Sequence, residues 1–214
     1  NEFSVKNTDV SLTLENMEDT DTTTTEPIYW KILLDEIDFE NVGFALNMPQ
    51  DSLFVRTMLP KTTLKDGVID LKEASYYVKS FDMDNAELAY GPKEELSLKK
   101  IGLQLDSIYY CGRDIRANVE EFVFKERSGL ELVSTEGRIA SDSVLIQIPK
   151  FTMKTTASSL DLQTKIGWDV LEMKKTGVLS AKINAEIGKG DVAKILGGRD
   201  TLFLQTYPNK PFVF

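Results

Sequence analysis

The sequence has no histidine and a single cysteine, Cys111, in 214 residues. The missing histidine excludes a histidine general base, a Ser-His or Cys-His nucleophile and a histidine-ligated metal. One thiol cannot form a disulfide within the chain. Because no run of eighteen apolar residues occurs, the sequence predicts no membrane-spanning helix. The commonest catalytic arrangements are therefore absent, and we expect neither enzymatic activity nor a cofactor.

Basic residues are also in the minority. The chain has 25 lysines and arginines against 34 aspartates and glutamates, which gives a net charge of −9. Nucleic-acid binding requires a basic surface, so no nucleic-acid partner is expected. The acidic balance also disfavours electrostatic attachment to an anionic membrane surface. An acidic exterior keeps such a chain in solution.

Short runs of alternating apolar residues dominate what is present, and each run breaks in the same way. Alternation at period two is typical of strands with one buried face. In each break the apolar residues are three positions apart rather than two. The clear breaks are Phe39→Val42, Met83→Ala86, Leu105→Ile108, Val119→Phe122 and Ile148→Phe151, with a weaker one at Leu64→Gly67.

A step of three exchanges the buried face for the exposed one unless the strand bends or bulges at the step. The residues inside the steps are mostly polar, as in Asp84-Asn85 and Glu120-Glu121. The steps recur loosely, about every twenty residues, as in stacked repeat structures. Two architectures explain the pattern equally well: a stacked solenoid or open groove, and an antiparallel sandwich or barrel with bulges.

The remaining elements are expected to be mostly strands. They cover residues 3–14, 28–34, 37–46, 53–58, 64–71, 81–90, 101–110, 115–125, 130–133, 144–153, 160–166, 179–187 and 202–207. A short helix is expected over residues 191–197, with Asp191 as its N-cap and Gly197-Gly198 at its end. Residues 92–100 are ambiguous, because Pro92 and the Glu95–Lys99 spacing also suit a short helix. Residues 18–26 are acidic and rich in threonine, and they are predicted to form a flexible loop.

Three local motifs resemble a calcium loop, a catalytic carboxylate pair and a phosphate loop, but each lacks a feature that the site requires. Residues 82–85, DMDN, begin like a calcium loop, but Ala86 and Glu87 occupy positions that need a ligand and a glycine. The adjacent carboxylates Glu120-Glu121 point to opposite faces of a strand and cannot converge on one substrate. Residues 188–190, GKG, lack the spacing and hydroxyl of a phosphate loop. We therefore assign no catalytic or metal-binding residue.

The stepped strands resemble the repeats of the AsmA/TamB family of Gram-negative envelope proteins. The resemblance rests on LLDEIDFENVGFAL (33–46), TTLKDGVIDLKEASYYVKSFDMDNAELAY (62–90), LSLKKIGLQLDSIYY (96–110) and DIRANVEEFVF (114–124). GKGDVAKILGG (188–198) is similar to a short helix that interrupts the strands in this family. The likeness lies in the pattern of stepped, alternating strands rather than in invariant residues. It covers most of residues 30–200.

The resemblance implies an all-β, mainly antiparallel fold: an elongated folded-over sheet, or β-groove solenoid, with one or two short helices. It also implies a periplasmic protein anchored in the inner membrane by parts outside this sequence. Members of the family are associated with phospholipid transport and with outer-membrane protein assembly. The expected partners are therefore phospholipid acyl chains and an outer-membrane assembly protein.

Residues 1–214 are expected to be one elongated segment of a longer protein, because the chain starts at Asn1 without methionine and enters a strand pattern at once. Such a segment should self-associate through its terminal strands, near residues 5–14 or 202–214. The best candidates for a lipid-facing surface follow the steps, although the sequence leaves open which strand phase lines the groove. They are Val42, Phe44, Leu88, Ile108, Phe122 and Phe124. The alternative is a sandwich or solenoid binding module that recognises carbohydrate or protein.

Overall fold

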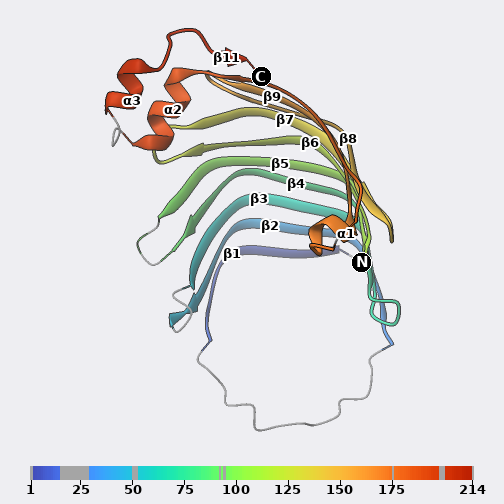
Figure 1. The fold of residues 1–214 in the computed structure, drawn as a ribbon. Coiled ribbons are helices and arrows are strands. Elements are labelled where there is room, and N and C mark those ends of the chain that lie inside the picture. The colour runs from blue at the N-terminus through green and yellow to red at the C-terminus, as the bar shows by residue number, and fades with distance from the viewer. Residues whose placement is uncertain are drawn as a thin grey trace.

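A computed structural model describes residues 2–14, 29–49, 53–91, 93, 95–174, 176–197 and 201–213, the first three of the last range by their backbone alone. Strands make up 73% of the structure and helices 9%. The strands form one open sheet in which each strand lies beside the next along the chain (Figure 1). Every described pairing is antiparallel except that of β1 with β2. The expected elongated, mainly antiparallel all-β fold is confirmed.

The strands are long in the first half of the chain and shorter in the second. They are β1 (Glu2–Thr13), β2 (Lys31–Met48), β3 (Leu53–Asp70), β4 (Ser75–Tyr90), β5 (Leu96–Cys111), β6 (Asp114–Glu126), β7 (Glu131–Ser141), β8 (Leu145–Thr155), β9 (Ser159–Gly167), β10 (Leu179–Ile187) and β11 (Phe212–Val213). The helices are α1 (Trp168–Leu171), α2 (Lys189–Leu196) and α3 (Thr201–Thr206). The loop expected at residues 18–26 lies outside the described residues.

The sheet is bent into an arch (Figure 1). Residues with left-handed backbone conformation lie within the sequence steps of several strands. In β2 the step from Phe39 to Val42 contains Asn41, with φ 54°, and its side-chain amide donates a hydrogen bond to Asn7 Oδ1 of β1 at 3.2 Å. Asn7 is also left-handed, with φ 49°. The steps in β3, β4 and β5 contain Asp66, Asn85 and Ser107, all with φ between 52° and 55°. A left-handed residue re-phases the alternation, so apolar residues before and after the step share one side.

Two steps use bulges instead. Gln104 and Leu105 are neighbours in β5, but their partners in β6, Glu121 and Val119, are two residues apart. One residue of β6 therefore has no partner in β5 and forms a bulge. The register of β8 against β9 shifts in the same way between Ile148 and Phe151. The prediction that each step marks a bend or a bulge is confirmed: some steps contain a left-handed residue, and the others contain a bulge.

The apolar side of the sheet lies on the inside of the bends. Side chains there are buried at the bend, with Ala86 of β4 at 0% exposure and Val42 of β2 at 6%. On the opposite side of the same bends, Asn41, Asp84 and Asn85 are exposed. A strand that folds over has a longer outer side and a shorter inner side. Here the outer side carries polar pairs, and the inner side carries small or apolar residues. We call these two sides the inner face and the outer face.

No second layer covers the sheet among the described residues. The accessible surface of the chain is 14833 Å², whereas a compact monomer of this mass would expose about 10,000 Å². No large side chain in the described ranges is fully buried. Stability therefore depends on strand pairing and on the contacts of side chains that share the inner face, rather than on a closed core.

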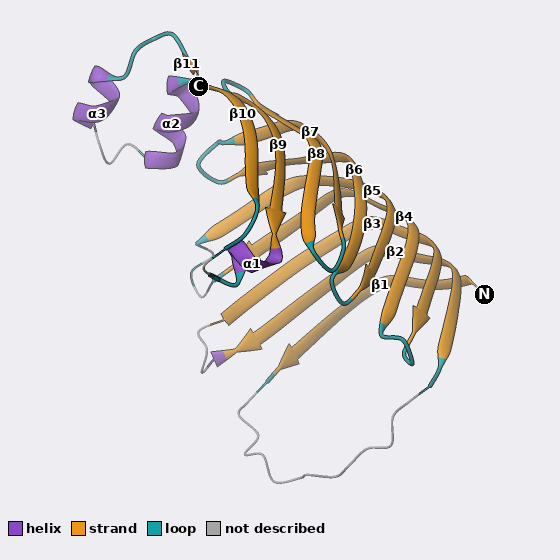
Figure 2. Cartoon of the chain, turned by 45° about the vertical axis from the view of Figure 1, so that its right-hand side comes forward, coloured by secondary structure: helices purple, strands orange, loops and turns teal. Residues whose placement is uncertain are grey.

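The helices lie at the margins of the sheet. Figure 2 shows α2 and α3 beyond the last strands and α1 at the opposite ends of the strands. Asp191 was expected to cap α2, but the N-cap is Gly188 and Asp191 lies within the first turn. Gly197 ends the helix in the left-handed conformation, with φ 57°, as expected. Residues 202–207, expected to be a strand, contain α3 instead, because a short apolar run does not distinguish the two structures.

The helix considered for residues 92–100 does not form at its described end. Strand β5 begins at Leu96, and its register with β4 starts at Tyr90↔Leu96. The Glu95 carboxylate accepts a hydrogen bond from the backbone N–H of Lys93 at 3.3 Å, so it serves the turn rather than a helical ion pair. The Ser128-Gly129 turn between β6 and β7 forms as expected.

The Asp191 carboxylate attaches α2 to the β8–β9 hairpin. It accepts hydrogen bonds from the hydroxyls of Thr155, Thr156 and Ser158, and the residue is 3% exposed. Burial acts to raise its pKa, but the hydroxyl hydrogen bonds and the Lys194 charge outweigh burial and lower the pKa below 3.8. The ionised carboxylate thus replaces the expected cap as the polar anchor of this helix.

Asp191→Ala is expected to lower the free energy of unfolding by about 2 kcal/mol, because hydrogen bonds to a charged group contribute roughly 1.5–3 kcal/mol. Because the folded-state pKa is depressed, this contribution is present above pH 3.8 and is lost as the pH falls through the folded-state value. Urea titrations at pH 7 and pH 3 measure the difference. Asp169→Ala, at an exposed position in α1, is the control. An equal effect of the two substitutions at pH 7 would refute the anchoring role.

Candidate functional site

An apolar row crosses the inner face from β1 to β10. Paired residues of neighbouring strands point to the same side of a sheet. The row follows printed strand pairings from β1 to β10. Its members are Phe3, Ile37, Leu64, Phe81, Leu105, Val119, Gly137, Phe151, Leu162 and Ile183. Nine of ten positions carry a large apolar side chain, so the row forms a continuous apolar track perpendicular to the strands.

Parallel rows widen this track. One contains Val5, Phe39, Thr62, Met83, Leu103 and Phe122. Beyond the first bend lies the row Val10, Phe44, Thr57, Leu88, Leu98 and Glu126. Beyond the other bend lie Leu34, Gly67, Val78 and Ile108. The inner face is therefore mainly apolar on both limbs of the arch as well as across its top, and Glu126 is the one charged member of these rows.

Gly67 lies at a close approach between side chains at the bend. A Cβ there would lie 3.2 Å from Leu64 Cδ2 and 3.3 Å from Leu34 Cβ. Both neighbours belong to the inner face, on β3 and β2. The crowding shows that the apolar side is the compressed side of the bend.

All six residues singled out from the sequence lie on the inner face, but they differ in exposure. Val42 is 6% exposed and is sealed at the bend, whereas Phe44, two residues on, is 37% exposed. Leu88 and Ile108 are half-buried in their rows. The rings of Phe122 and Phe124 pack 5.4 Å apart. Both strand phases contribute to one surface, because the bends re-phase the strands.

Two hydroxyls on the inner face have no hydrogen-bond partner. Thr62 Oγ1 of β3 and Thr135 Oγ1 of β7 are buried and unpaired among the described atoms. A buried hydroxyl without a partner is unfavourable by roughly 1–3 kcal/mol. Neither was identifiable from the sequence, because threonine is common on either side of a strand.

One rim of the arch, where β2, β4 and β10 begin and β3, β5 and β9 end, carries exposed aromatic and aliphatic side chains. They are Tyr29, Trp30, Leu33, Tyr76, Tyr77, Tyr110, Val144, Leu171, Met173, Val178 and Leu179. Trp30 is 68% exposed, and the rings of Tyr76 and Tyr110 lie 5.9 Å apart. Tryptophan and tyrosine favour boundaries between apolar material and water. Their clustering was missed from the sequence, although the pairs Tyr76-Tyr77 and Tyr109-Tyr110 at strand ends were a usable signal.

The outer face is polar and carries cross-strand ion pairs. Lys79 Nζ of β4 lies 2.9 Å from Asp66 of β3, and this hydrogen bond raises the pKa of the lysine. Lys65 pairs with Glu36, and Lys150 with Glu136. Exposed pairs of this kind contribute little stability. They keep the outer surface hydrated and give it a chemistry opposite to that of the inner face.

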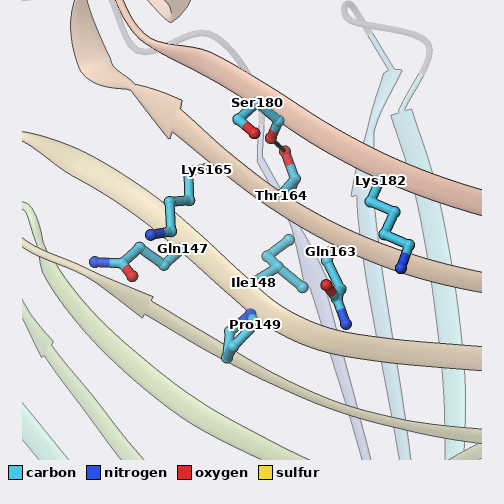
Figure 3. A pocket seen from close by; sticks show the side chains of 8 residues that line it. All are labelled: Gln147, Ile148, Pro149, Gln163, Thr164, Lys165, Ser180 and Lys182. Atoms are coloured by element: carbon cyan, nitrogen blue, oxygen red, sulfur yellow. Dashed lines mark hydrogen bonds between the residues drawn. The ribbon is translucent and has the colours of Figure 1, made fainter.

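The outer face carries open depressions lined by both polar and apolar atoms. The one drawn in Figure 3 has a volume of about 300 Å³ and lies over β8, β9 and β10. Gln147, Gln163, Lys165 and Lys182 line it, and the Thr164 hydroxyl donates to the Ser180 carbonyl at 3.0 Å. No group of three or more metal-binding side chains occurs in the described part of the chain. None of the helices there has the length and apolar composition to cross a membrane.

Comparison with known proteins identifies no relative. No family model, curated protein or solved structure matches the chain. The geometry of the inner face and the pattern of the sequence are the features that point to a function.

Proposed function

We propose that this chain is a non-enzymatic segment whose inner face holds the acyl chains of phospholipids. The observation that carries the proposal is the apolar row that crosses the sheet from Phe3 to Ile183 without a charged residue. Moving an acyl chain out of water is favourable by about 0.8 kcal/mol for each CH₂ covered. A continuous apolar surface provides that cover for a chain lying along the row.

The open architecture supports the same proposal. A closed binding module would bury its apolar residues between two layers, whereas here large side chains such as Phe44 remain accessible on the inner face. An open side leaves a charged headgroup in water while its acyl chains lie on the sheet. The aromatic rim, with Trp30 and Tyr76, places amphipathic rings at the boundary that such a lipid would cross.

The resemblance to AsmA/TamB-like envelope proteins extends this to a cellular role. We propose that the segment belongs to a protein of the periplasm, attached to the inner membrane by other parts, that moves phospholipid between membranes or supports outer-membrane protein assembly. A phospholipid is the proposed ligand and an outer-membrane assembly protein a further partner. The alternative, recognition of carbohydrate or protein, would use the polar outer-face depression near Lys165 and Lys182.

Native mass spectrometry of the 214-residue chain purified from a Gram-negative host tests the ligand. The expected result is a population carrying one or more phospholipid masses, which disappears after extraction with organic solvent. A chain that stays free of lipid, both on purification and after incubation with phospholipid vesicles, would exclude the proposal.

A further inference from the structure

Strand β1 forms one margin of the sheet. Among the described residues it pairs with β2 alone, which leaves its other edge without a strand partner. Its inner-face residues Phe3, Val10 and Leu12 are exposed there. An exposed strand edge with an apolar face is a template for a further strand.

The sequence of β1 is complementary to itself when a second copy is set antiparallel to it. With Glu2 opposite Thr13, the pairs are Phe3 with Leu12, Ser4 with Ser11, Val5 with Val10, and Lys6 with Asp9. Every apolar residue then faces an apolar residue. Lys6 of each copy faces Asp9 of the other, which gives two pairs of opposite charges. A slip of one residue in either direction loses these pairings.

The bend in β1 also fits this arrangement. Asn7, the left-handed residue, lies next to the midpoint of the strand and separates two limbs of similar length. A two-fold axis that bisects the bend exchanges these limbs, so both copies fold over in the same direction. Phe3 and Val5 of one copy would then continue the inner-face rows into Leu12 and Val10 of the other.

Two charged residues on the outer face of β1, Lys6 and Asp9, would lie at the contact between the two copies. Lys6 Nζ lies 2.6 Å from Glu40 Oε2, and both side chains are about half exposed. Asp9 forms no ion pair with any described residue, and its carboxylate lies over Gly43 of β2. In the proposed symmetric pair, Lys6 of the second copy would face Asp9, and the Asp9 carboxylate would turn from Gly43 toward the open edge to meet it.

We propose that two copies of this chain associate through β1 in this antiparallel register, forming a two-fold dimer whose sheets and inner faces are continuous. The inference does not depend on the identity of the ligand. Because both copies use the same edge, association stops at the dimer. Head-to-tail contact between β1 and the partly open edge of β10 would produce chains of increasing length instead.

Charge exchange tests the pairing. Asp9→Lys sets a second positive charge against Lys6 of the second copy, and Lys6→Asp sets a second negative charge against Asp9. Each variant should therefore dimerise at least about tenfold more weakly than the parent. An equimolar mixture of the two variants restores both pairs and should dimerise like the parent. Sedimentation velocity over a concentration series measures all three. Variants that dimerise normally, or a mixture that stays monomeric, would overturn the register.

Disulfide trapping tests the register directly. In a Cys111→Ser background, the double variant Ser4→Cys/Ser11→Cys places two thiols on facing positions, within the Cα separation that a disulfide spans. Each single variant leaves the thiols of the two copies roughly 20 Å apart. The expected result is a covalent dimer from the double variant and from mixed single variants, but not from either single variant alone. Equal trapping by a single variant, or unlimited polymers, would contradict the proposal.

Discussion

Ala86→Asp is expected to unfold the central strands of the sheet. Ala86 has 0% exposure on the inner side of the β4 bend, opposite the buried Ile101 of β5. A carboxylate there would be buried without a partner, and its desolvation should lower the free energy of unfolding by at least about 3 kcal/mol. For a protein of ordinary stability, about 5–15 kcal/mol, this is a large fraction of the total. Urea denaturation followed by far-ultraviolet circular dichroism measures the change.

Ala89→Asp is the matched control for this prediction. Ala89 lies three residues further along β4 on the outer face, between Arg56 of β3 and Ser97 of β5. The same chemical change at this polar surface should alter stability by less than about 1 kcal/mol. If both substitutions had the same effect, the two faces would not differ in burial at the bend, and the assignment of inner and outer faces would be wrong.

Phe44→Asp is expected to leave the sheet folded and to weaken phospholipid binding at least about tenfold. Phe44 lies on the inner face of β2 beyond the bend and is already 37% exposed, so the substitution buries no charge completely. A carboxylate in the apolar row would leave about two CH₂ groups of a bound acyl chain without cover, which corresponds to roughly 1.6 kcal/mol. Titration with a fluorescent phospholipid analogue measures affinity, and thermal unfolding monitors the fold.

The control for Phe44 lies on the neighbouring strand. Met58 of β3 is 41% exposed, similar to Phe44, but it lies on the outer face opposite Gly43. Met58→Asp should therefore bind the analogue with the affinity of the parent. Equal losses at both positions would indicate a general effect on the fold, and no loss at Phe44 would argue against acyl-chain binding on the inner face.

The strand pattern and the bends were predictable because both leave a local trace in the sequence. Apolar residues three positions apart, flanking pairs such as Asp84-Asn85, mark the places where the inner face must be kept through a bend. Asparagine and aspartate tolerate the left-handed backbone conformation that such a bend uses. The six candidate residues follow these steps, and for that reason they lie on one surface.

Other features depend on contacts between distant segments and could not be derived in the same way. Asp191 looked like a helix cap, but its partners Thr155 and Ser158 come from a hairpin more than thirty residues earlier. The exposure of Val42 and Phe44 differs because one lies at the bend and the other beyond it. The open sheet was one of two architectures that fit the alternation, since periodicity shows that a residue is covered but not what covers it.

Photocrosslinking at matched positions on the two faces tests the acyl-chain proposal most directly. A photoreactive amino acid replaces Phe44 in one variant and Met58 in another, and each is irradiated with phospholipid vesicles or in Gram-negative cells. Mass spectrometry then identifies the adducts. The proposal predicts covalent phospholipid adducts at Phe44, on the inner face, and at most background at Met58, on the outer face. Adducts at Met58 alone, equal labelling of both positions, or no lipid at Phe44 would contradict it.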